Sequence, residues 1–267
     1  WHKNLFQEML KDRELISPEP YRIWEYYNQK CSLAQAYDIA INNKGIRDLP
    51  KPTIRLSKEE LLMARQMMTE VKEKTGKDKI IVVQPFGRGA QPEKMTEKQM
   101  EKGKQPDISD VTGRSIELKN IWSIVRKLSK KYGVMMMSEF PLEFKNHMSA
   151  PVATPMNVHI RIWMALIKQT NHFVGCDSVG QHLAYAFDGT ATVIIGSTYP
   201  INTSFPDAEN IDIIDLGSED RVYSPIRITS DEFSDRLNEG IMAMEDQTED
   251  KVIKSVEKML KQSKNKQ

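Results

Sequence analysis

Residues 173–187 read FVGCDSVGQHLAYAF, and this stretch decides the fold class that the sequence predicts. The apolar run that ends at Cys176 predicts a buried strand over 172–176, and residues 179–187 predict a short helix. Asp177 and Ser178 stand where the strand gives way to the helix. A strand that runs directly into a helix is a building unit of α/β proteins.

Strands and helices alternate on both sides of this stretch. Apolar runs predict strands at 80–84, 134–137, 192–195 and 212–216. Capping signals and helical periodicity predict helices between Ser57 and Gly76 and at about 118–128, 158–170 and 249–261. Gly133 is predicted to cap the second of these helices. The alternation predicts an α/β fold, a Rossmann-like parallel sheet with flanking helices on both faces.

Three regions follow from this pattern. Residues 1–52 are predicted as short helices and a linker that contains two prolines. Residues 53–230 hold the alternating strands and helices, and residues 231–267 are predicted as C-terminal helices. Residues 91–112 are polar and lack periodicity, which predicts a surface insertion.

Composition excludes several classes of protein. The 267 residues carry 38 basic and 37 acidic side chains, and this balance argues against a dedicated nucleic-acid binder. Two distant cysteines, Cys31 and Cys176, predict no disulfide framework and no cysteine zinc site, which favours a reducing, cytoplasmic location. The apolar runs fall far short of the ~20 residues of a transmembrane helix, and no signal peptide is visible.

The loop after Cys176 is the first candidate site. Ligands of open parallel sheets bind outside the carboxyl ends of the strands. The helix that starts here presents free amide hydrogens and a dipole that favours anions, so a diphosphate would fit. Gly180 leaves room for close approach, and Ser178 and His182 could add contacts. The alternative is that Asp177 or Ser178 simply caps the helix.

Two further loops follow predicted strands. Gly87-Arg88-Gly89 could bring backbone and a guanidinium group to a phosphate, although a plain turn with an exposed arginine fits equally well. After the strand at 134–137 come Glu139 and Glu143, either of which could accept hydrogen bonds from a ribose. The alternative is that both glutamates are only solvated.

Residues 177–184, together with Gly196-Ser197-Thr198 and Pro200, resemble glycosyltransferase family 9, the ADP-heptose:lipopolysaccharide heptosyltransferase group. Its pattern is Asp-Ser/Thr-Gly, two residues, then His-Leu. This chain has Val179 at the usual glycine and places its glycine one residue later. The resemblance implies a nucleotide-sugar site, with Glu139 competing for the role of Glu143. Its residues would be Gly87, Arg88, Gly89, Arg114, Glu143, Asp177, Ser178, Val179, Gly180, His182 and Thr198.

The resemblance also implies a GT-B fold, in which two Rossmann-like domains face each other and the C-terminal one binds the nucleotide-diphosphate sugar. The expected reaction is inverting transfer to a hydroxyl of a glycan or glycolipid acceptor, in lipopolysaccharide biosynthesis and without an obligatory metal cofactor. Membrane contact would be peripheral, through the acceptor.

The N-terminal Rossmann-like domain, with its general-base aspartate, is not recognisable in this sequence. Residues 1–50 resemble only its last helices, so the chain is expected to be a fragment or to lack catalysis. One alternative is a catalytically degenerate domain that acts as a binding or structural module. Another is a GT-B enzyme of a different kind, such as an epimerase.

Overall fold

The computed structural model describes residues 18–94, 106–110, 112–144, 148–222, 238 and 240–265. The chain forms two compact units, Trp1–Pro50 and Lys51–Gln267. The described part of the first unit holds three short helices around a small core of Tyr26, Cys31 and Ala36. These helices are η1 (Pro20–Arg22), α2 (Trp24–Tyr27) and α3 (Leu33–Asn42).

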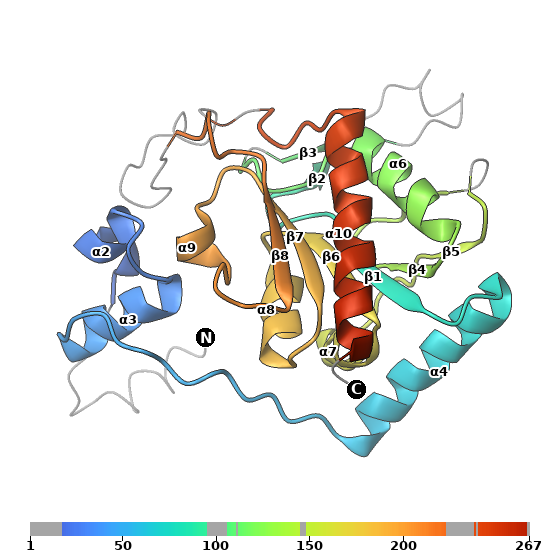
Figure 1. The fold of residues 1–267 in the computed structure, drawn as a ribbon, viewed down its shortest axis with the longest axis horizontal. Helices are drawn as coiled ribbons and strands as arrows, with labels where there is room; N and C mark the ends of the chain where they lie inside the picture. Colours follow the sequence, from blue (N-terminus) through green and yellow to red (C-terminus); the bar gives the residue numbers. More distant parts are fainter. Residues whose placement is uncertain are drawn as a thin grey trace. The chain divides into compact units, whose positions relative to one another are not determined.

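A parallel sheet of six strands forms the centre of the second unit (Figure 1). Its strands are β1 (Ile80–Gln84), β4 (Gly133–Met136), β5 (Val152–Ala153), β6 (His172–Cys176), β7 (Ala191–Ile195) and β8 (Ile211–Asp215). They lie in the order β5-β4-β1-β6-β7-β8, and all neighbours are parallel. Counted along the chain, this is the order 3-2-1-4-5-6 of the Rossmann fold. The predicted Rossmann-like parallel sheet is therefore confirmed.

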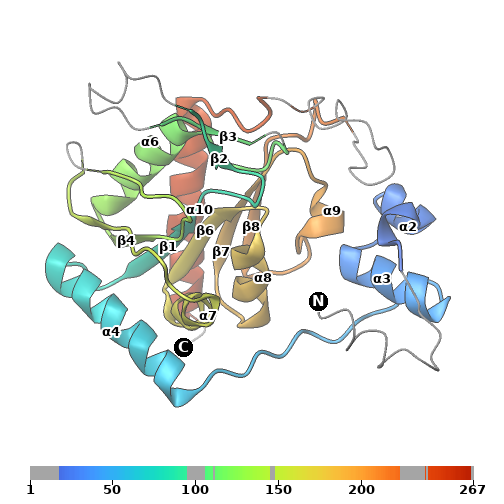
Figure 2. The same cartoon turned by 180° about the vertical axis from the view of Figure 1, so that it is seen from behind.

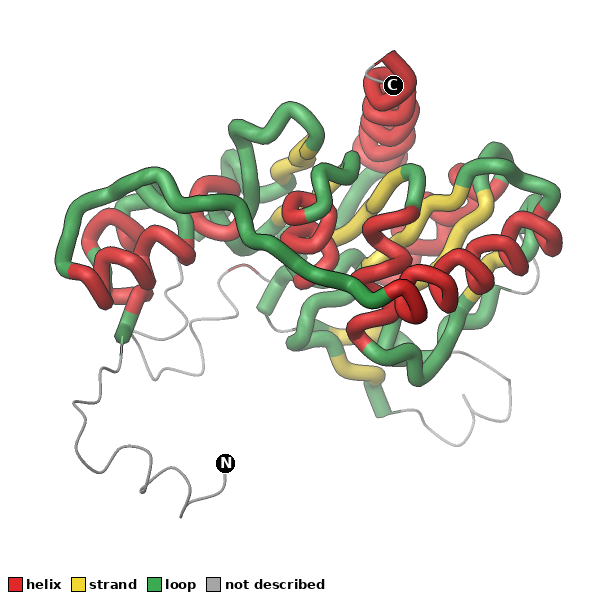
Figure 3. Tube along the Cα trace, turned by 90° about the horizontal axis from the view of Figure 1, so that it is seen from below, coloured by secondary structure: helices red, strands yellow, loops and turns green. Residues whose placement is uncertain are grey.

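Helices cover both faces of this sheet, as Figures 2 and 3 show. The helices of this unit are α4 (Lys58–Thr75), α6 (Leu118–Ser129), α7 (Ile160–Gln169), α8 (Val179–Ala186), α9 (Pro200–Thr203) and α10 (Asp246–Asn265). One face is covered by α6 and α10, and the other by α4, α7 and α8. Within the described residues, no helix is both long and apolar enough to cross a membrane.

The strands are apolar on both faces because both faces are covered. Along β1, side chains alternate between the two cores. Ile81 and Val83 pack toward α6 and α10, whereas Ile80 and Val82 pack toward α4 and α7. All five residues of β1, β6 and β7 are buried, which explains why their sequences are continuous rather than alternating apolar runs.

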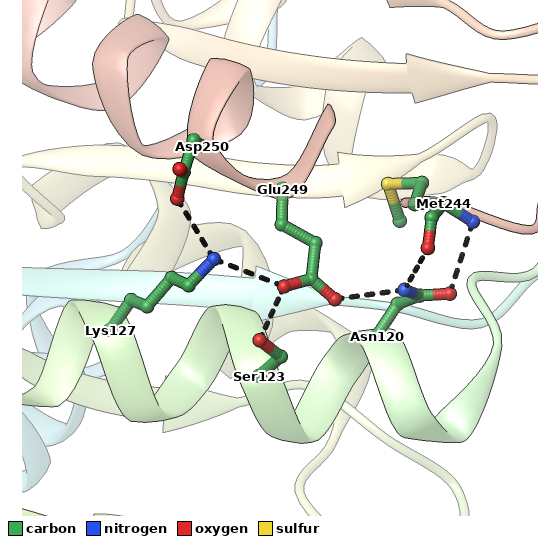
Figure 4. A network of polar contacts seen from close by, with 6 residues as sticks. All are labelled: Asn120, Ser123, Lys127, Met244, Glu249 and Asp250. Atoms are coloured by element: carbon green, nitrogen blue, oxygen red, sulfur yellow. Dashed lines mark hydrogen bonds and ion pairs between the residues drawn. The ribbon is translucent and has the colours of Figure 1, made fainter. Parts of the chain in front are cut away.

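The C-terminal helix α10 belongs to the same compact unit as the sheet. Its Glu249, 3% exposed, accepts hydrogen bonds from Asn120 Nδ2 at 2.8 Å and from Ser123 Oγ (Figure 4). Lys127 Nζ lies 3.1 Å from the same carboxylate and 2.9 Å from Asp250. These contacts fasten α10 to α6.

Two local predictions differ from the structure. Gly133 does not cap α6, whose C-cap is Lys130; Gly133 instead begins β4. A Cβ at this position would lie 2.6 Å from Ile80 Cδ1, so close packing explains the glycine. The ends of the polar insertion pair as a small antiparallel ladder, β2 (Gln91–Pro92) with β3 (Ile108–Ser109). Most of the rest of the insertion lies outside the described residues.

Candidate functional site

A cavity of about 460 Å³ opens where β1, β4 and β6 end. The chain leaves β1 toward β4 on one side of the sheet and later returns through α7 to β6 on the other. This reversal is the topological switch point, where open α/β sheets bind ligands. The cavity is lined by Gln84, Phe86, Gly87, Arg88, Met137, Ser138, Glu139, Phe140, Met156, Asn157, Val158, Ile160, Trp163, Ser178 and Val179. We call it the switch-point pocket.

Two charged side chains line this pocket. Arg88 follows β1 and Glu139 follows β4, and both residues are exposed. In the part of the chain that the structure describes, neither forms a hydrogen bond or an ion pair. The pocket therefore offers one cation and one anion that a ligand can engage. Glu139 is in the lining, whereas Glu143 is not.

Apolar side chains make up most of the remaining wall. Phe86 and Phe140 meet edge to face, with ring centroids 5.8 Å apart. Met156, Ile160 and Val179 line the same pocket although they are 38–40% exposed. Large apolar groups that are exposed around a cavity suit a flat, largely apolar ligand surface. A nucleobase has this character.

The amide of Gly180 is occupied by the protein itself. Gln84 Oε1 accepts a hydrogen bond from Gly180 N at 2.8 Å, and Gln84 Nε2 donates one to Ser178 Oγ at 3.0 Å. A Cβ at Gly180 would lie 2.3 Å from the Phe173 ring and 2.5 Å from Gln84 Oε1. Packing within the protein thus requires the glycine, and its amide is already bound by Gln84. Among described groups, the amides of Ser178 and Val179 have no acceptor.

Asp177 lies in a buried polar network rather than on the pocket wall. It is 5% exposed and accepts hydrogen bonds from Gln181 Nε2 at 2.5 Å and Thr198 Oγ1 at 2.8 Å. Gln181 Oε1 in turn accepts a hydrogen bond from Ser204 Oγ. This network connects the start of α8 to the segment after β7. Asp177 and Thr198 therefore contribute to holding these two segments together.

The glycines of the loop after β1 pack against residues 110–115. Gly87 N donates to Ser115 Oγ at 2.9 Å, and a Cβ at Gly89 would lie 2.5 Å from Asp110 Oδ1. Asp110 accepts hydrogen bonds from Thr112 and from Ser115. Close packing within the protein therefore accounts for Gly89, whereas a Cβ at Gly87 would meet its nearest neighbour at 3.5 Å, an ordinary contact; of the two glycines, only Gly87 lines the pocket.

Three other predicted residues lie away from the pocket lining. Arg114 Nε donates to Thr112 Oγ1 at 3.2 Å, and the ring of His182 packs edge to face on Phe205, with centroids 5.5 Å apart. Glu143 is exposed between two core residues, Leu142 and Phe144. No three His, Cys, Asp or Glu side chains of the described segments gather as metal ligands.

Solved glycosyltransferases share this architecture. At the level of sequence, the chain matches no protein-family model and no curated protein. A structure described as the glycosyl transferase family 9 from Veillonella parvula aligns with 97% of this chain at a TM-score of 0.58 and 11% identity. Escherichia coli ADP-heptose lps heptosyltransferase II aligns with 88% at a TM-score of 0.52 and 16% identity. The chain has the fold of glycosyltransferase family 9.

This chain spans 65% of the Veillonella chain and 63% of the E. coli chain, just under two thirds of each. The family 9 fold agrees with the resemblance seen around residues 177–184 and with the GT-B-type Rossmann-like sheet that it implied. At the identities found, the likeness concerns the fold alone.

Within this family 9 fold, several pocket residues lie where the sequence indicated no site. Gln84, Met156, Asn157 and Trp163 line the pocket but belong to no recognised motif. Gln84 is the last residue of a predicted strand, and its position at a carboxyl end could have drawn attention to it. Asn157 has a φ of 57°, a left-handed conformation that asparagine tolerates and that the sequence did not indicate.

Proposed function

We propose that this chain contains the donor-binding half of a glycosyltransferase and binds a nucleoside-diphosphate sugar in the switch-point pocket. The observation that carries the proposal is the position of the pocket. It lies at the point where β1 and β6 diverge in a Rossmann-type sheet, and it holds Arg88 and Glu139 without described partners. The solved glycosyltransferases with this fold support the same class of reaction.

The lining suggests how the donor would bind. Its base would lie against the apolar wall of Met156 and Ile160, and its ribose hydroxyls would donate to Glu139. The diphosphate would lie between Arg88 and the free amides of Ser178 and Val179, which begin α8. All three parts of a nucleoside diphosphate therefore have a chemically matched wall.

The reaction would move the sugar to an acceptor hydroxyl of a glycan or glycolipid. The acceptor oxygen forms a bond to the anomeric carbon, the bond from that carbon to the phosphate oxygen breaks, and the hydroxyl proton passes to solvent water. Negative charge develops on the leaving nucleoside diphosphate. Arg88 and the amides at the start of α8 would stabilise this charge, and this stabilisation requires no metal. Inversion at the anomeric carbon is part of the proposal.

A second candidate is a binding module that retains the pocket without transferring sugar. The use of the Gly180 amide by Gln84 favours it, because one of the helix-start donors is lost to the ligand. This candidate would be supported if the protein binds a nucleotide sugar but transfers the sugar to no acceptor.

The test is a thermal-shift and calorimetric screen of ADP, GDP and UDP. At 100 times its dissociation constant, a bound ligand stabilises the folded state by about 2.7 kcal/mol. Arg88→Ala is expected to weaken binding about tenfold or more, because a charge-assisted contact is lost. The matched control is Arg126→Ala, an exposed arginine on α6 that is not in the pocket lining. No shift with any diphosphate, or equal losses in the two variants, would reject the proposal.

A further inference from the structure

The side chain of Gln84 connects the end of β1 to the start of α8, the helix that follows β6. It is the last residue of β1 and is 8% exposed. Its carboxamide reaches across to the start of α8, where it contacts Gly180 N at 2.8 Å and Ser178 Oγ at 3.0 Å. Both polar atoms of the carboxamide therefore bind within residues 178–180, one to a side-chain hydroxyl and one to a backbone amide.

Chemistry decides which way each hydrogen bond runs. A backbone amide can only donate, so the atom that faces Gly180 N must be the Gln84 oxygen. The opposite orientation would place two donors against each other. Gln84 Nε2 then faces Ser178 Oγ, and this hydroxyl oxygen must accept.

A hydroxyl that accepts from Gln84 keeps its own proton for another partner. Ser178 lines the switch-point pocket, and its hydroxyl donates to no group in the described part of the chain. The amides of Ser178 and Val179 beside it are also donors without acceptors there. Three donors thus gather at one end of the pocket, an arrangement that fits phosphate oxygens.

We infer that Gln84 is a positioning residue that makes Ser178 a hydrogen-bond donor and so gives the pocket its preference for a diphosphate over an uncharged nucleoside. The inference rests on the proposed function and adds a determinant of ligand class to it. Because Gln84 occupies the Gly180 amide and Phe173 fills the space around it, the diphosphate binds at Ser178 and Val179 rather than deeper.

The test is Gln84→Glu, which keeps the size of the side chain. One carboxylate oxygen can still accept from Gly180 N, but the other cannot donate to Ser178, so the serine proton turns toward the carboxylate and away from the ligand. A negative charge is also added beside the diphosphate. Affinity for the diphosphate that the wild type binds best is expected to fall tenfold or more by calorimetry. Affinity for its parent nucleoside should change less than twofold.

Ser178→Ala provides an independent arm if the first variant does not fold. It removes the hydroxyl donor without adding charge, so diphosphate affinity should fall about tenfold with nucleoside affinity unchanged. If Gln84 had a purely structural role, Gln84→Glu would instead lower the affinities for the diphosphate and for the nucleoside by the same factor. That result overturns the inference. Diphosphate binding that is unchanged in either variant also overturns it. A wild-type chain that binds neither ligand overturns the proposed function and this inference with it.

Discussion

At the scale of single residues, His172 is a titratable side chain enclosed in the core. It is fully buried in β6, with its ring nitrogens 2.9 Å from Thr190 Oγ1 and 2.9 Å from Thr192 Oγ1. Thr192 Oγ1 lies 2.7 Å from Ser255 Oγ on α10, so the polar chain continues across the core. Burial lowers the pKa of His172 from 6.5 to about 3, because the charged imidazolium would be desolvated. The ring is therefore neutral at physiological pH.

This neutral histidine predicts a pH-dependent stability. Below pH 6.5 the unfolded chain binds a proton at His172 that the folded chain does not bind, so stability falls as the pH drops toward about 3. The slope for one proton is about 1.4 kcal/mol per pH unit. Urea unfolding at pH 7.5, 6.0 and 5.0 should show this loss, and His172→Gln should have a shallower dependence. Equal slopes for the two proteins would contradict the assignment.

At the scale of elements, a network of buried polar contacts joins α10 to α6. Figure 4 shows Glu249 between Ser123, Asn120 and Lys127, with Asn120 also donating to Met244 O at 2.8 Å. Burial alone would raise the pKa of Glu249. The hydrogen bonds from Ser123 and Asn120, together with Lys127, outweigh this effect and lower the pKa below its usual value. The carboxylate is therefore charged and fully engaged.

Removing this carboxylate should loosen the contact between the two helices. Glu249→Ala removes the acceptor of Ser123 Oγ, one of the two acceptors of Asn120 Nδ2 and the buried partner of Lys127, and we expect a loss of about 2–3 kcal/mol in the free energy of unfolding. Asp250→Asn is the matched control, because Asp250 pairs with the same Lys127 but has an exposed side chain. Its loss should be much smaller than that of Glu249→Ala, because an exposed ion pair is screened by solvent. Urea unfolding measures both, and similar losses would show that burial of Glu249 is unimportant.

At the scale of the whole molecule, the chain divides into units with separate cores. Among the residues that the structure describes, the core of Trp1–Pro50 contains Tyr26, Cys31 and Ala36, and both sheet cores consist of residues from Lys51–Gln267. Residues 43–57 carry no helix or strand. The complete switch-point pocket is lined by the second unit.

These separate cores predict that residues 51–267 fold alone. The shortened protein should unfold in one cooperative transition, with a circular-dichroism midpoint close to that of the same transition in the full chain. It should also keep the nucleotide affinity of the full chain, since every lining residue is present. A loss of cooperativity or of binding would show that the first unit is needed for the second.

Much of the fold could be predicted from the sequence because its signals are local. The strands at 80–84 and 172–176 have the predicted bounds, and the capping box of Ser57 and Glu60 begins α4 as expected. Such features depend on residues that are neighbours along the chain. The sequence also placed Arg88 and Ser178 just after predicted strands and Val179 at the start of a predicted helix, and these residues line the pocket.

Only the tertiary structure decided the strand order, and with it which loops meet at the switch point. It selected Glu139 over Glu143 for the pocket lining, and it placed Met156 there from a loop without a recognised motif. It also showed that Gln84 occupies the amide of Gly180, a contact between residues 96 positions apart. A local pattern predicts that a helix begins with free donors. Whether another side chain fills them depends on how distant strands pair, which no local pattern contains.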